Sequence, residues 1–197
     1  MKHSFIIATH NQRKARQIEE VLQFYHYNGQ MYTTKLPQQQ FPPEATISYR
    51  ENAIGKAVFI SRQLPTDLII ADDSGLELVA FPNRYGVQTA RELAVEVPNG
   101  QLNNYLIHLV AGKSRQFSMK TTIALAVGGH VKKIGYGELT GTIADKERGQ
   151  NSTGFDRIFI PAGEKRTLAE MERAQRFSYL HRARAVKNLV AQLENAR

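Results

Sequence analysis

The chain has 197 residues, of which 42% are hydrophobic, and a formal net charge of +8. This length and composition suit a globular protein with a sizeable core and exclude a disordered chain, while the absence of cysteine excludes disulfides, thiol catalysis and thiolate metal sites. We expect a cytoplasmic protein without membrane association, since no apolar run approaches the ~18 residues of a membrane span and the N-terminus lacks signal-peptide features.

The first half of the chain predicts alternating strands and helices. Apolar residues follow one another in short runs typical of buried strands, and elsewhere recur at helical spacing. Ser48, with Glu51 three residues later, forms a capping box that opens a helix. The elements expected here are strands at 4–9, 67–72 and 76–80, helices at 11–25 and 48–64, and a Pro- and Gln-rich loop at 35–48.

The second half is richer in strand signals. Residues 117–143 read as two strands joined at Gly128-Gly129, a pair typical of a hairpin turn. Thr167 and Glu170 form a second capping box. Helices are expected at 99–112 and 181–196, and a strand at 157–163. Without repeats or linkers, the sequence predicts one domain over 1–197, an α/β fold with a long mixed β-sheet and flanking helices.

The segment ATHNQRK lies in the first strand-to-helix turn. Thr9 and Asn11 can cap the helix, whose N-terminus offers free N–H groups to an anion, and Lys14 stands on its first turn. Ordinary capping explains the same residues, and the segment lacks the glycines of a P-loop. It therefore remains a candidate phosphate site.

In the segment ADDSG, the two aspartates follow the apolar residues LIIA. Asp72 and Asp73 are expected at the carboxyl end of a strand, where ligands of α/β sheets gather. Two carboxylates there suit Mg²⁺, with Glu44 from the Pro-rich loop as a possible third ligand. Ser74 and Gly75 are expected to turn the backbone close to a ligand, although an Asx turn accounts for them equally well.

Three further positions complete the candidates. Lys56 projects from a mostly apolar helix, where a snorkelling lysine is the alternative. Residues 154–156, GFD, offer a turn, a stacking ring and a carboxylate. His181 and Arg182 begin the last helix, well placed for an anion or a carbonyl oxygen.

Taken in order, these segments resemble the inosine triphosphate pyrophosphatase family, which acts on non-standard purine nucleoside triphosphates. The resemblance extends over the whole chain through ATHNQRK, Glu44, ENAIGKA, ADDSG, TAR at 89–91, GFD, TLAEM and HR at 181–182. It implies two lobes around a central cleft, a homodimer, Mg²⁺ dependence, and hydrolysis of ITP, dITP or XTP to the monophosphate and pyrophosphate.

The resemblance also implies a role for each matching residue. Asp73 is the proton acceptor, and Glu44, Asp72 and Asp73 hold the metal. The remaining residues bind substrate: Thr9, His10, Asn11, Lys14, Lys56, Ser74 and Arg91 at the triphosphate, and Thr153, Gly154, Phe155, Asp156, Arg176, His181 and Arg182 at the base and sugar.

Departures from the family pattern concentrate at the base. Thr153 stands where the family has an aromatic residue, Arg157 where it has proline, and Leu180 where it has serine; Arg176 replaces a lysine and Gln17 a glutamate. The metal and phosphate residues match well, so the departures concern the preference for the base.

Two alternatives use the same residues differently. A phosphatase or phosphotransferase with Asp72 as nucleophile would release orthophosphate. A nucleic-acid-binding module would explain the basic charge but leaves ADDSG without a role, and we expect no stable nucleic-acid complex.

Overall fold

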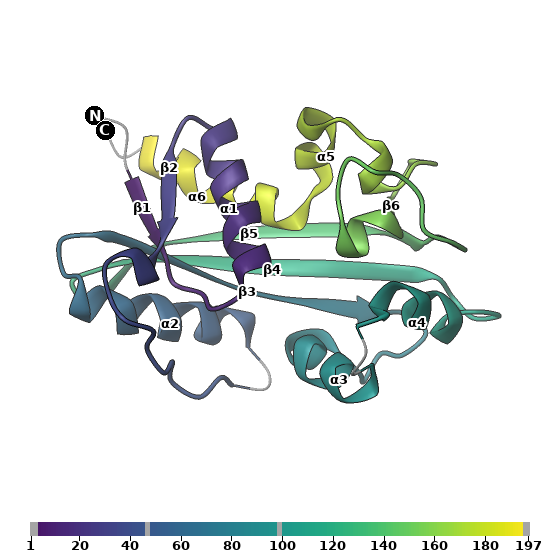
Figure 1. The fold of residues 1–197 in the computed structure, drawn as a ribbon, viewed down its shortest axis with the longest axis horizontal. Helices are drawn as coiled ribbons and strands as arrows, with labels where there is room; N and C mark the ends of the chain where they lie inside the picture. Colours follow the sequence, from purple (N-terminus) through teal and green to yellow (C-terminus); the bar gives the residue numbers. More distant parts are fainter. Residues whose placement is uncertain (1–3, 46–47, 98–99, 195–197) are drawn as a thin grey trace. The chain divides into compact units, whose positions relative to one another are not determined.

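The computed structural model describes residues 4–45, 48–97 and 100–194. Within them the strands form a six-stranded sheet in the order β2-β1-β3-β4-β5-β6 (Figure 1). β1 pairs in parallel with β2 and β3, whereas β5 pairs antiparallel with β6, so the predicted mixed sheet and α/β class are confirmed. The strands are β1 (Ser4–Ile7), β2 (Asn28–Met31), β3 (Leu68–Leu78), β4 (Gln116–Val127), β5 (His130–Ile143) and β6 (Phe159–Pro161).

Helices make up most of the remaining regular structure. The α-helices are α1 (Gln12–Phe24), α2 (Tyr49–Gln63), α3 (Thr89–Glu96), α4 (Leu102–Leu109), α5 (Arg173–Tyr179) and α6 (His181–Glu194). Four short 3-10 helices are also present in the described residues: η1 (Tyr32–Thr34), η2 (Gly86–Gln88), η3 (Gly154–Arg157) and η4 (Leu168–Glu170). None of the helices in this part of the chain has both the length and the hydropathy needed to cross a membrane.

The chain divides into two compact units. Unit 1 contains the described residues of Met1–Asp73, Thr121–Gly137 and Arg182–Arg197, and unit 2 contains those of Ser74–Lys120 and Glu138–His181. β3, β4 and β5 contribute residues to both units. The prediction of one domain with two lobes and a cleft stays a prediction.

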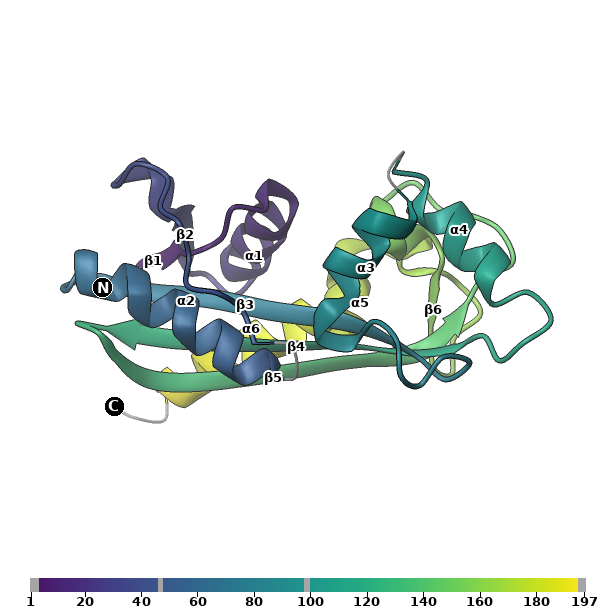
Figure 2. The ribbon, with the colours of Figure 1, turned by 90° about the horizontal axis from the view of Figure 1, so that it is seen from below.

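In unit 1, α2 packs its small and branched residues against the strands. Ala53, Ala57 and Ile60 share a buried cluster with Ile6 of β1 and Ile69 of β3. Figure 2 shows α2 in front of these strands and α6 behind them. Helices on both faces exclude water from β1 and from the first half of β3, which explains why their sequences are continuous apolar runs.

Local sequence signals place the helix starts. Asn11 caps α1, since its Oδ1 accepts hydrogen bonds from the backbone N–H groups of Arg13 and Lys14. Ser48 caps α2 by accepting from the N–H of Glu51. The second predicted capping box, at Thr167, has both of its bonds but opens the single turn η4.

The hairpin prediction is confirmed. Gly128 and Gly129 connect β4 to β5 with φ angles of 58° and 81°. Two consecutive residues at positive φ are the requirement of a type I′ turn, which glycine meets without a Cβ clash.

The largest difference from the predicted elements lies at ADDSG. Two strands were expected at 67–72 and 76–80, but β3 runs without interruption from Leu68 to Leu78. The turn expected at Ser74 and Gly75 is therefore wrong. Among the described residues, β1 pairs with β3 only at 68–70, and β4 is the other neighbour of β3 in the sheet. Pairing with β4 therefore favours an extended backbone at residues that favour turns elsewhere.

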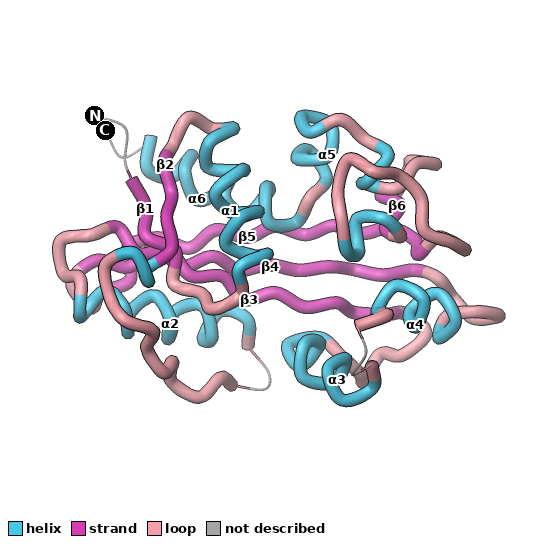
Figure 3. The backbone as a smooth tube through the Cα atoms, in the orientation of Figure 1, coloured by secondary structure: helices cyan, strands magenta, loops and turns pink. Residues whose placement is uncertain are grey.

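The other predicted elements agree apart from their ends. The loop expected at 35–48 is irregular over 37–45 (Figure 3), the helix expected at 99–112 is α4, and that at 181–196 is α6. Residues 46–47, 99 and 195–196 of these predictions lie outside the described residues. β2, α3 and α5 were not predicted, because β2 is polar and the two helices are short.

Candidate active site

The continuous strand directs the two aspartates to different partners. Successive side chains of a strand point to opposite faces, and both aspartates are buried. Asp72 meets residues of α1 and α6, whereas Asp73 meets residues of α2. Two adjacent acids thus occupy two different environments within unit 1.

Asp72 lies in a basic environment. The Arg182 Nε–H donates to Asp72 Oδ2 at 3.0 Å, and Lys14 Nζ lies 3.6 Å from the same oxygen. Arg182 also donates from Nη1 to the side-chain oxygen of Gln17. Burial raises the pKa of Asp72, but the charges of Lys14 and Arg182 outweigh it and hold the pKa well below its usual range. Asp72 is therefore an anion in the folded protein.

One side-chain oxygen of Asp72 differs from the other in its hydrogen bonding. Asp72 Oδ1 is buried and, within the described residues, accepts no bond. A buried carboxylate oxygen without a partner is costly, so Asp72 Oδ1 has the capacity to accept from a further donor.

Asp73 is held by α2 and shares a cation with Glu44. The Asn52 side-chain amide donates to Asp73 Oδ2 at 2.8 Å. Lys56 Nζ lies 3.7 Å from Asp73 Oδ1 and 3.0 Å from Glu44 Oε1. Burial raises the pKa of Asp73 against the lowering effects of Lys56 and Asn52. Asp73 is thus the more easily protonated member of the pair.

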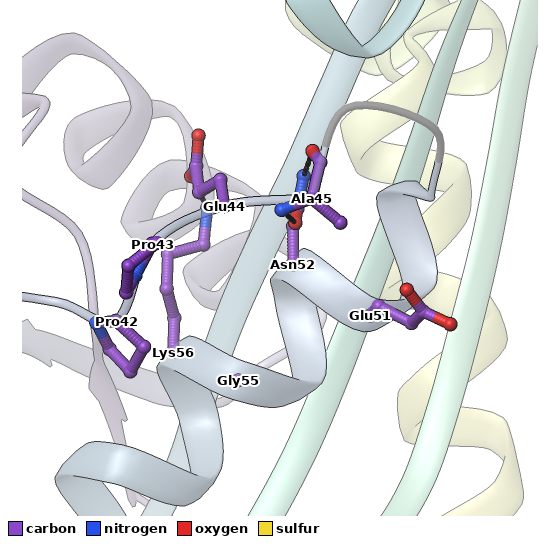
Figure 4. A pocket seen from close by; sticks show the side chains of 8 residues that line it. All are labelled: Pro42, Pro43, Glu44, Ala45, Glu51, Asn52, Gly55 and Lys56. Carbon is purple, nitrogen blue, oxygen red and sulfur yellow. Dashed lines mark hydrogen bonds and ion pairs between the residues drawn. The ribbon is translucent and has the colours of Figure 1, made fainter.

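A cavity adjoins this group. It has a volume of about 230 Å³ and lies between the Pro-rich loop and α2 (Figure 4). In Figure 4 the side chains of Glu44 and Lys56 lie close together, while Asn52 meets the backbone of Ala45. Its lining residues are Pro42, Pro43, Glu44, Ala45, Glu51, Asn52, Gly55 and Lys56.

The donor set fits Mg²⁺ through two carboxylates rather than three. Glu44 and Asp73 converge on one ammonium group, but no set of three acidic or histidine side chains in the described residues is close enough to hold a metal. Mg²⁺ needs only one or two carboxylates when phosphate oxygens and water complete its shell. Glu44 and Asp73 are the residues that would hold it, and Asp72 faces away from them.

The first turn of α1 is used partly for structure. The side chain of Asn11 caps the helix, and Thr9 Oγ1 accepts from the Asn11 N–H at 3.2 Å. His10 stacks on Phe41 with ring centroids 4.5 Å apart and hydrogen-bonds Tyr32. Lys14 links this turn to the buried carboxylates through its ion pair with Asp72.

The predicted site residues divide between the two units. Unit 1 contains Thr9, His10, Asn11, Lys14, Glu44, Lys56, Asp72, Asp73 and Arg182, and unit 2 contains Ser74, Arg91, Thr153, Gly154, Phe155, Asp156, Arg176 and His181. Arg182, expected at the base, is bonded to Asp72 within the carboxylate group. Ser74 lies in β3 and Arg91 in the first turn of α3.

In unit 2 the turn Thr153–Asp156 is held by hydrogen bonds and a ring contact. The Ser152 hydroxyl donates to the buried Asp156 at 2.6 Å. Phe155 packs beside Phe159, with ring centroids 5.3 Å apart. The Asn103 side chain donates to the Gly154 carbonyl at 2.9 Å. These bonds hold the turn within unit 2.

The departures near this turn have structural roles. Arg157 forms an ion pair with Glu147 at 2.7 Å, and Glu147 also accepts from Asn103. Leu180 is buried, so it serves packing. Arg176 donates from Nη1 to the Asn151 carbonyl at 2.8 Å.

Three polar residues of these groups were not predicted. Gln17 accepts a hydrogen bond from Arg182, Asn103 donates one to the Gly154 carbonyl, and Asn52 donates one to Asp73. The sequence carries a signal for Asn52, which stands four residues before Lys56 and so one helical turn away on the same face of α2, and for Gln17, which departs from the family pattern.

Comparison with known proteins decides the family. The model of the Ham1 family matches residues 5–192. The chain belongs to the Ham1 family. Membership confirms the resemblance found in the sequence and the enzyme class that it implies, and it favours an enzyme over a nucleic-acid-binding module.

Individual relatives differ in their named substrates. The chain is 70% identical over 193 residues to a dihydroneopterin triphosphate diphosphatase of Limosilactobacillus reuteri, covering 98% of this chain and 99% of the relative. It is 35% identical over 191 residues to a dITP/XTP pyrophosphatase of Deinococcus deserti, covering 94% and 87%. A HAM1 protein structure from Coxiella burnetii superposes with a TM-score of 0.77 at 25% identity, covering 98% and 99%.

Proposed function

We propose that this protein hydrolyses a triphosphate to the monophosphate and pyrophosphate, with Asp73 as proton acceptor. The observation that carries the proposal is the Asp73–Lys56–Glu44 group, in which a buried carboxylate, a cation and a second carboxylate meet beside a cavity. Asp73 Oδ2 is engaged by Asn52, so Oδ1 is the oxygen positioned to take a proton from the attacking water.

The charge balance of unit 1 supports a role for a divalent cation. Three cations, Lys14, Lys56 and Arg182, are paired with three carboxylates, so the group is close to neutral. A triphosphate therefore needs further positive charge. Mg²⁺ bound at Glu44 and Asp73 would neutralise phosphate charge and assist ionisation of the attacking water.

The basic side chains bind the phosphates in this proposal. Lys14 lies 3.6 Å from Asp72 and is partly exposed, so its ammonium can shift to a phosphate oxygen. Lys56 stands between two carboxylates and can do the same. Lysine suits this exchange because its ammonium is a compact charge on a flexible stem.

Dihydroneopterin triphosphate is the first candidate substrate. The relative with that name is 70% identical across nearly the whole chain. The departures at Thr153, Arg157 and Leu180 fall on the ring side, whereas Glu44, Asp72, Asp73, Lys14 and Lys56 match the family pattern. A changed ring on an unchanged triphosphate is consistent with that distribution.

A non-standard purine triphosphate is the second candidate, favoured by the 35% identical dITP/XTP pyrophosphatase. Hypoxanthine, xanthine and the pterin ring all present a carbonyl beside a ring N–H, whereas adenine presents an amino group there. A site whose hydrogen-bonding groups match this edge binds both candidate substrates more tightly than ATP. The adenine amino group would leave buried polar groups unpaired, which costs binding free energy.

A substrate panel tests the proposal. Dihydroneopterin triphosphate, ITP, XTP, dITP, GTP and ATP are assayed with Mg²⁺, and pyrophosphate and orthophosphate are measured separately. We expect pyrophosphate as the main product and the highest kcat/KM for dihydroneopterin triphosphate. ITP, dITP or XTP as the best substrate would select the second candidate. Orthophosphate as the main product would support the phosphatase alternative with Asp72 as nucleophile.

Mg²⁺ dependence, a homodimer and a cytoplasmic location stay predictions based on the family resemblance. A chelator such as EDTA should abolish pyrophosphate release, and added Mg²⁺ should restore it. Light scattering of the purified chain should give twice the mass of 22.2 kDa.

A further inference from the structure

Asn52 connects the proton acceptor to the loop that carries Glu44. The residue is buried, with 4% exposure, although an asparagine is usually solvated. Its nitrogen donates to Asp73 Oδ2 at 2.8 Å and to the Ala45 carbonyl at 3.0 Å. Its oxygen accepts from the Ala45 N–H at 2.6 Å. Both ends of the amide are therefore engaged.

Asn52 and Lys56 act on the two oxygens of one carboxylate. They stand four residues apart on α2, so their side chains lie on the same face of the helix. Asn52 binds Asp73 Oδ2, and Lys56 approaches Oδ1. Each also reaches the Pro-rich loop, Asn52 through the backbone of Ala45 and Lys56 through the carboxylate of Glu44.

We infer that Asn52 is a positioning residue that orients the Asp73 carboxylate for the proposed reaction. A carboxylate rotates about its terminal bond over a broad range, so a single contact at Oδ1 leaves its plane undefined. The bond from Asn52 fixes Oδ2, and Oδ1 is then directed toward Lys56 and Glu44. Asn52 acts through Asp73 and through the Ala45 segment without itself touching the reacting atoms.

This inference rests on the proposed function, and it makes a specific kinetic claim. A hydrogen bond to a charged group contributes enough that its loss should lower kcat about 10- to 100-fold. Substrate affinity should change less than about threefold, because no phosphate-binding lysine is removed. A non-hydrolysable triphosphate analogue, titrated by calorimetry, gives that affinity without turnover.

Three variants separate orientation from general structure. Asn52→Ala removes every bond of the amide. Asn52→Asp retains an acceptor for the Ala45 N–H but removes the donor to Asp73. Ser61→Ala is the matched control, since Ser61 is also buried on α2 and hydrogen-bonded, at 3.0 Å, to the Gly129 N–H.

We expect both Asn52 variants to lose turnover and to keep analogue binding, with Asn52→Asp no better than Asn52→Ala. Ser61→Ala should lower thermal stability and leave kcat unchanged. An Asn52→Asp variant with wild-type kcat, or equal kcat losses in Asn52→Ala and Ser61→Ala, would overturn the inference.

A second measurement does not depend on activity. The chain has five aspartates, so labelling their side-chain carboxyl carbons gives few NMR signals, and Asp73→Asn assigns that of Asp73. Both Asn52 variants should shift this signal, and Ser61→Ala should not. An unshifted signal contradicts the inference even if the enzyme is active. If the wild type releases no pyrophosphate from any triphosphate, the proposed function fails, and the NMR result still decides whether Asn52 orients Asp73.

Discussion

At the scale of single residues, Asp72 and Asp73 are neighbours in sequence with different partners. Asp72 is bonded to Arg182 and has a depressed pKa, whereas Asp73 is bonded to Asn52 and has a raised pKa. A group that must accept a proton benefits from a raised pKa, and a group that must stay charged benefits from a depressed one. The two carboxylates are therefore suited to different tasks.

Replacing Asp73 tests the proton acceptor. Asp73→Asn keeps the shape of the side chain but removes its charge, so turnover should fall by at least about 100-fold, the usual contribution of a general base. Pyrophosphate release gives the rate, and a thermal melt checks that the fold survives. Near-normal turnover in a folded variant would exclude Asp73 as the acceptor.

Replacing the lysines tests phosphate binding. Lys14→Ala and Lys56→Ala should each raise the Kd of a triphosphate analogue at least about tenfold, since each removes a charge near the carboxylates. The order of preference among substrates with different rings should not change, because a lysine ammonium that binds phosphate makes no contact with the edge of the ring.

Lys35→Ala is the matched control for the lysines. Lys35 is also in unit 1 and is paired with a carboxylate, Asp67, at 2.6 Å, but it lies outside the candidate site. Its removal should leave the Kd unchanged. If Lys35→Ala weakens binding as much as the other two variants, the effect belongs to the overall charge of the protein.

At the scale of elements, β3 and α2 decide the site. Alternation along β3 separates the two aspartates, and one helical turn of α2 brings Asn52 and Lys56 to the same carboxylate. Asp72, Asp73, Asn52 and Lys56 thus stand on regular secondary structure, which holds side chains in place more firmly than a loop does, whereas Glu44 comes from the Pro-rich loop.

Two glycines of unit 1 should respond in opposite directions. Gly129→Ala should lower the free energy of unfolding by about 1 to 2 kcal/mol, because its φ of 81° is strained for any residue with a Cβ. Gly55→Ala should raise it by roughly 0.5 to 1 kcal/mol, since Gly55 lies within α2 and a Cβ there meets nothing within 4 Å.

Urea unfolding of both variants gives the two values. Each variant acts as the control for the other, because the chemical change is the same. Destabilisation by Gly55→Ala would show that the space beside α2 is filled. An unchanged free energy of unfolding in Gly129→Ala would contradict the positive φ of the turn at this residue.

In unit 2, helix α3 is anchored by Glu96. The hydroxyls of Tyr85 and Tyr105 donate to its carboxylate at 2.9 Å and 2.8 Å, and Arg84 pairs with it. Burial alone would raise the pKa of Glu96. The hydrogen bonds from Tyr105 and Tyr85 and the charge of Arg84 outweigh this effect, so the pKa lies below its usual 4.5. The bonds also hold Tyr85, whose φ is 68°.

The stabilising effect of Glu96 should depend on pH. Because its pKa is lower in the folded than in the unfolded chain, the stabilisation is present above about pH 4.5 and is lost as the pH falls through the folded pKa. Glu96→Gln should therefore destabilise the protein more at about pH 7 than at about pH 3.

Urea unfolding at both pH values measures this difference. Glu77→Gln is the control, since Glu77 forms an exposed ion pair with Lys120, which should contribute little at either pH. An equal loss of stability at both pH values in Glu96→Gln would show that its charge is not what stabilises α3.

At the scale of the whole molecule, the net charge of +8 should attract an anionic substrate. Salt screens such attraction, since the Debye length falls from ~10 Å at 0.1 M to ~3 Å at 1 M. We expect kcat/KM to fall at least about threefold as the NaCl concentration rises over this range at fixed Mg²⁺, while kcat changes little. A kcat/KM unaffected by salt would show that the net charge plays no part in substrate capture.

The sequence by itself determined the family, the helix caps at Asn11 and Ser48, and the hairpin at Gly128-Gly129, and it named the lysines and carboxylates of the candidate site. Caps and tight turns depend on residues within three or four positions of one another, so their signals are complete in a short segment. The family motifs are likewise short segments in a fixed order. Both kinds of signal can be read without knowing what packs against them.

Only the tertiary structure decided how these residues combine. Pairing of β3 within the sheet overrode the turn signal of Ser74 and Gly75, and the resulting alternation separated Asp72 from Asp73. Arg182 meets Asp72 across 110 residues of sequence, and Asn52 meets Asp73 across 21. Such contacts depend on the packing of whole elements, which no local pattern encodes, because a buried polar group takes whichever partner the fold brings within reach.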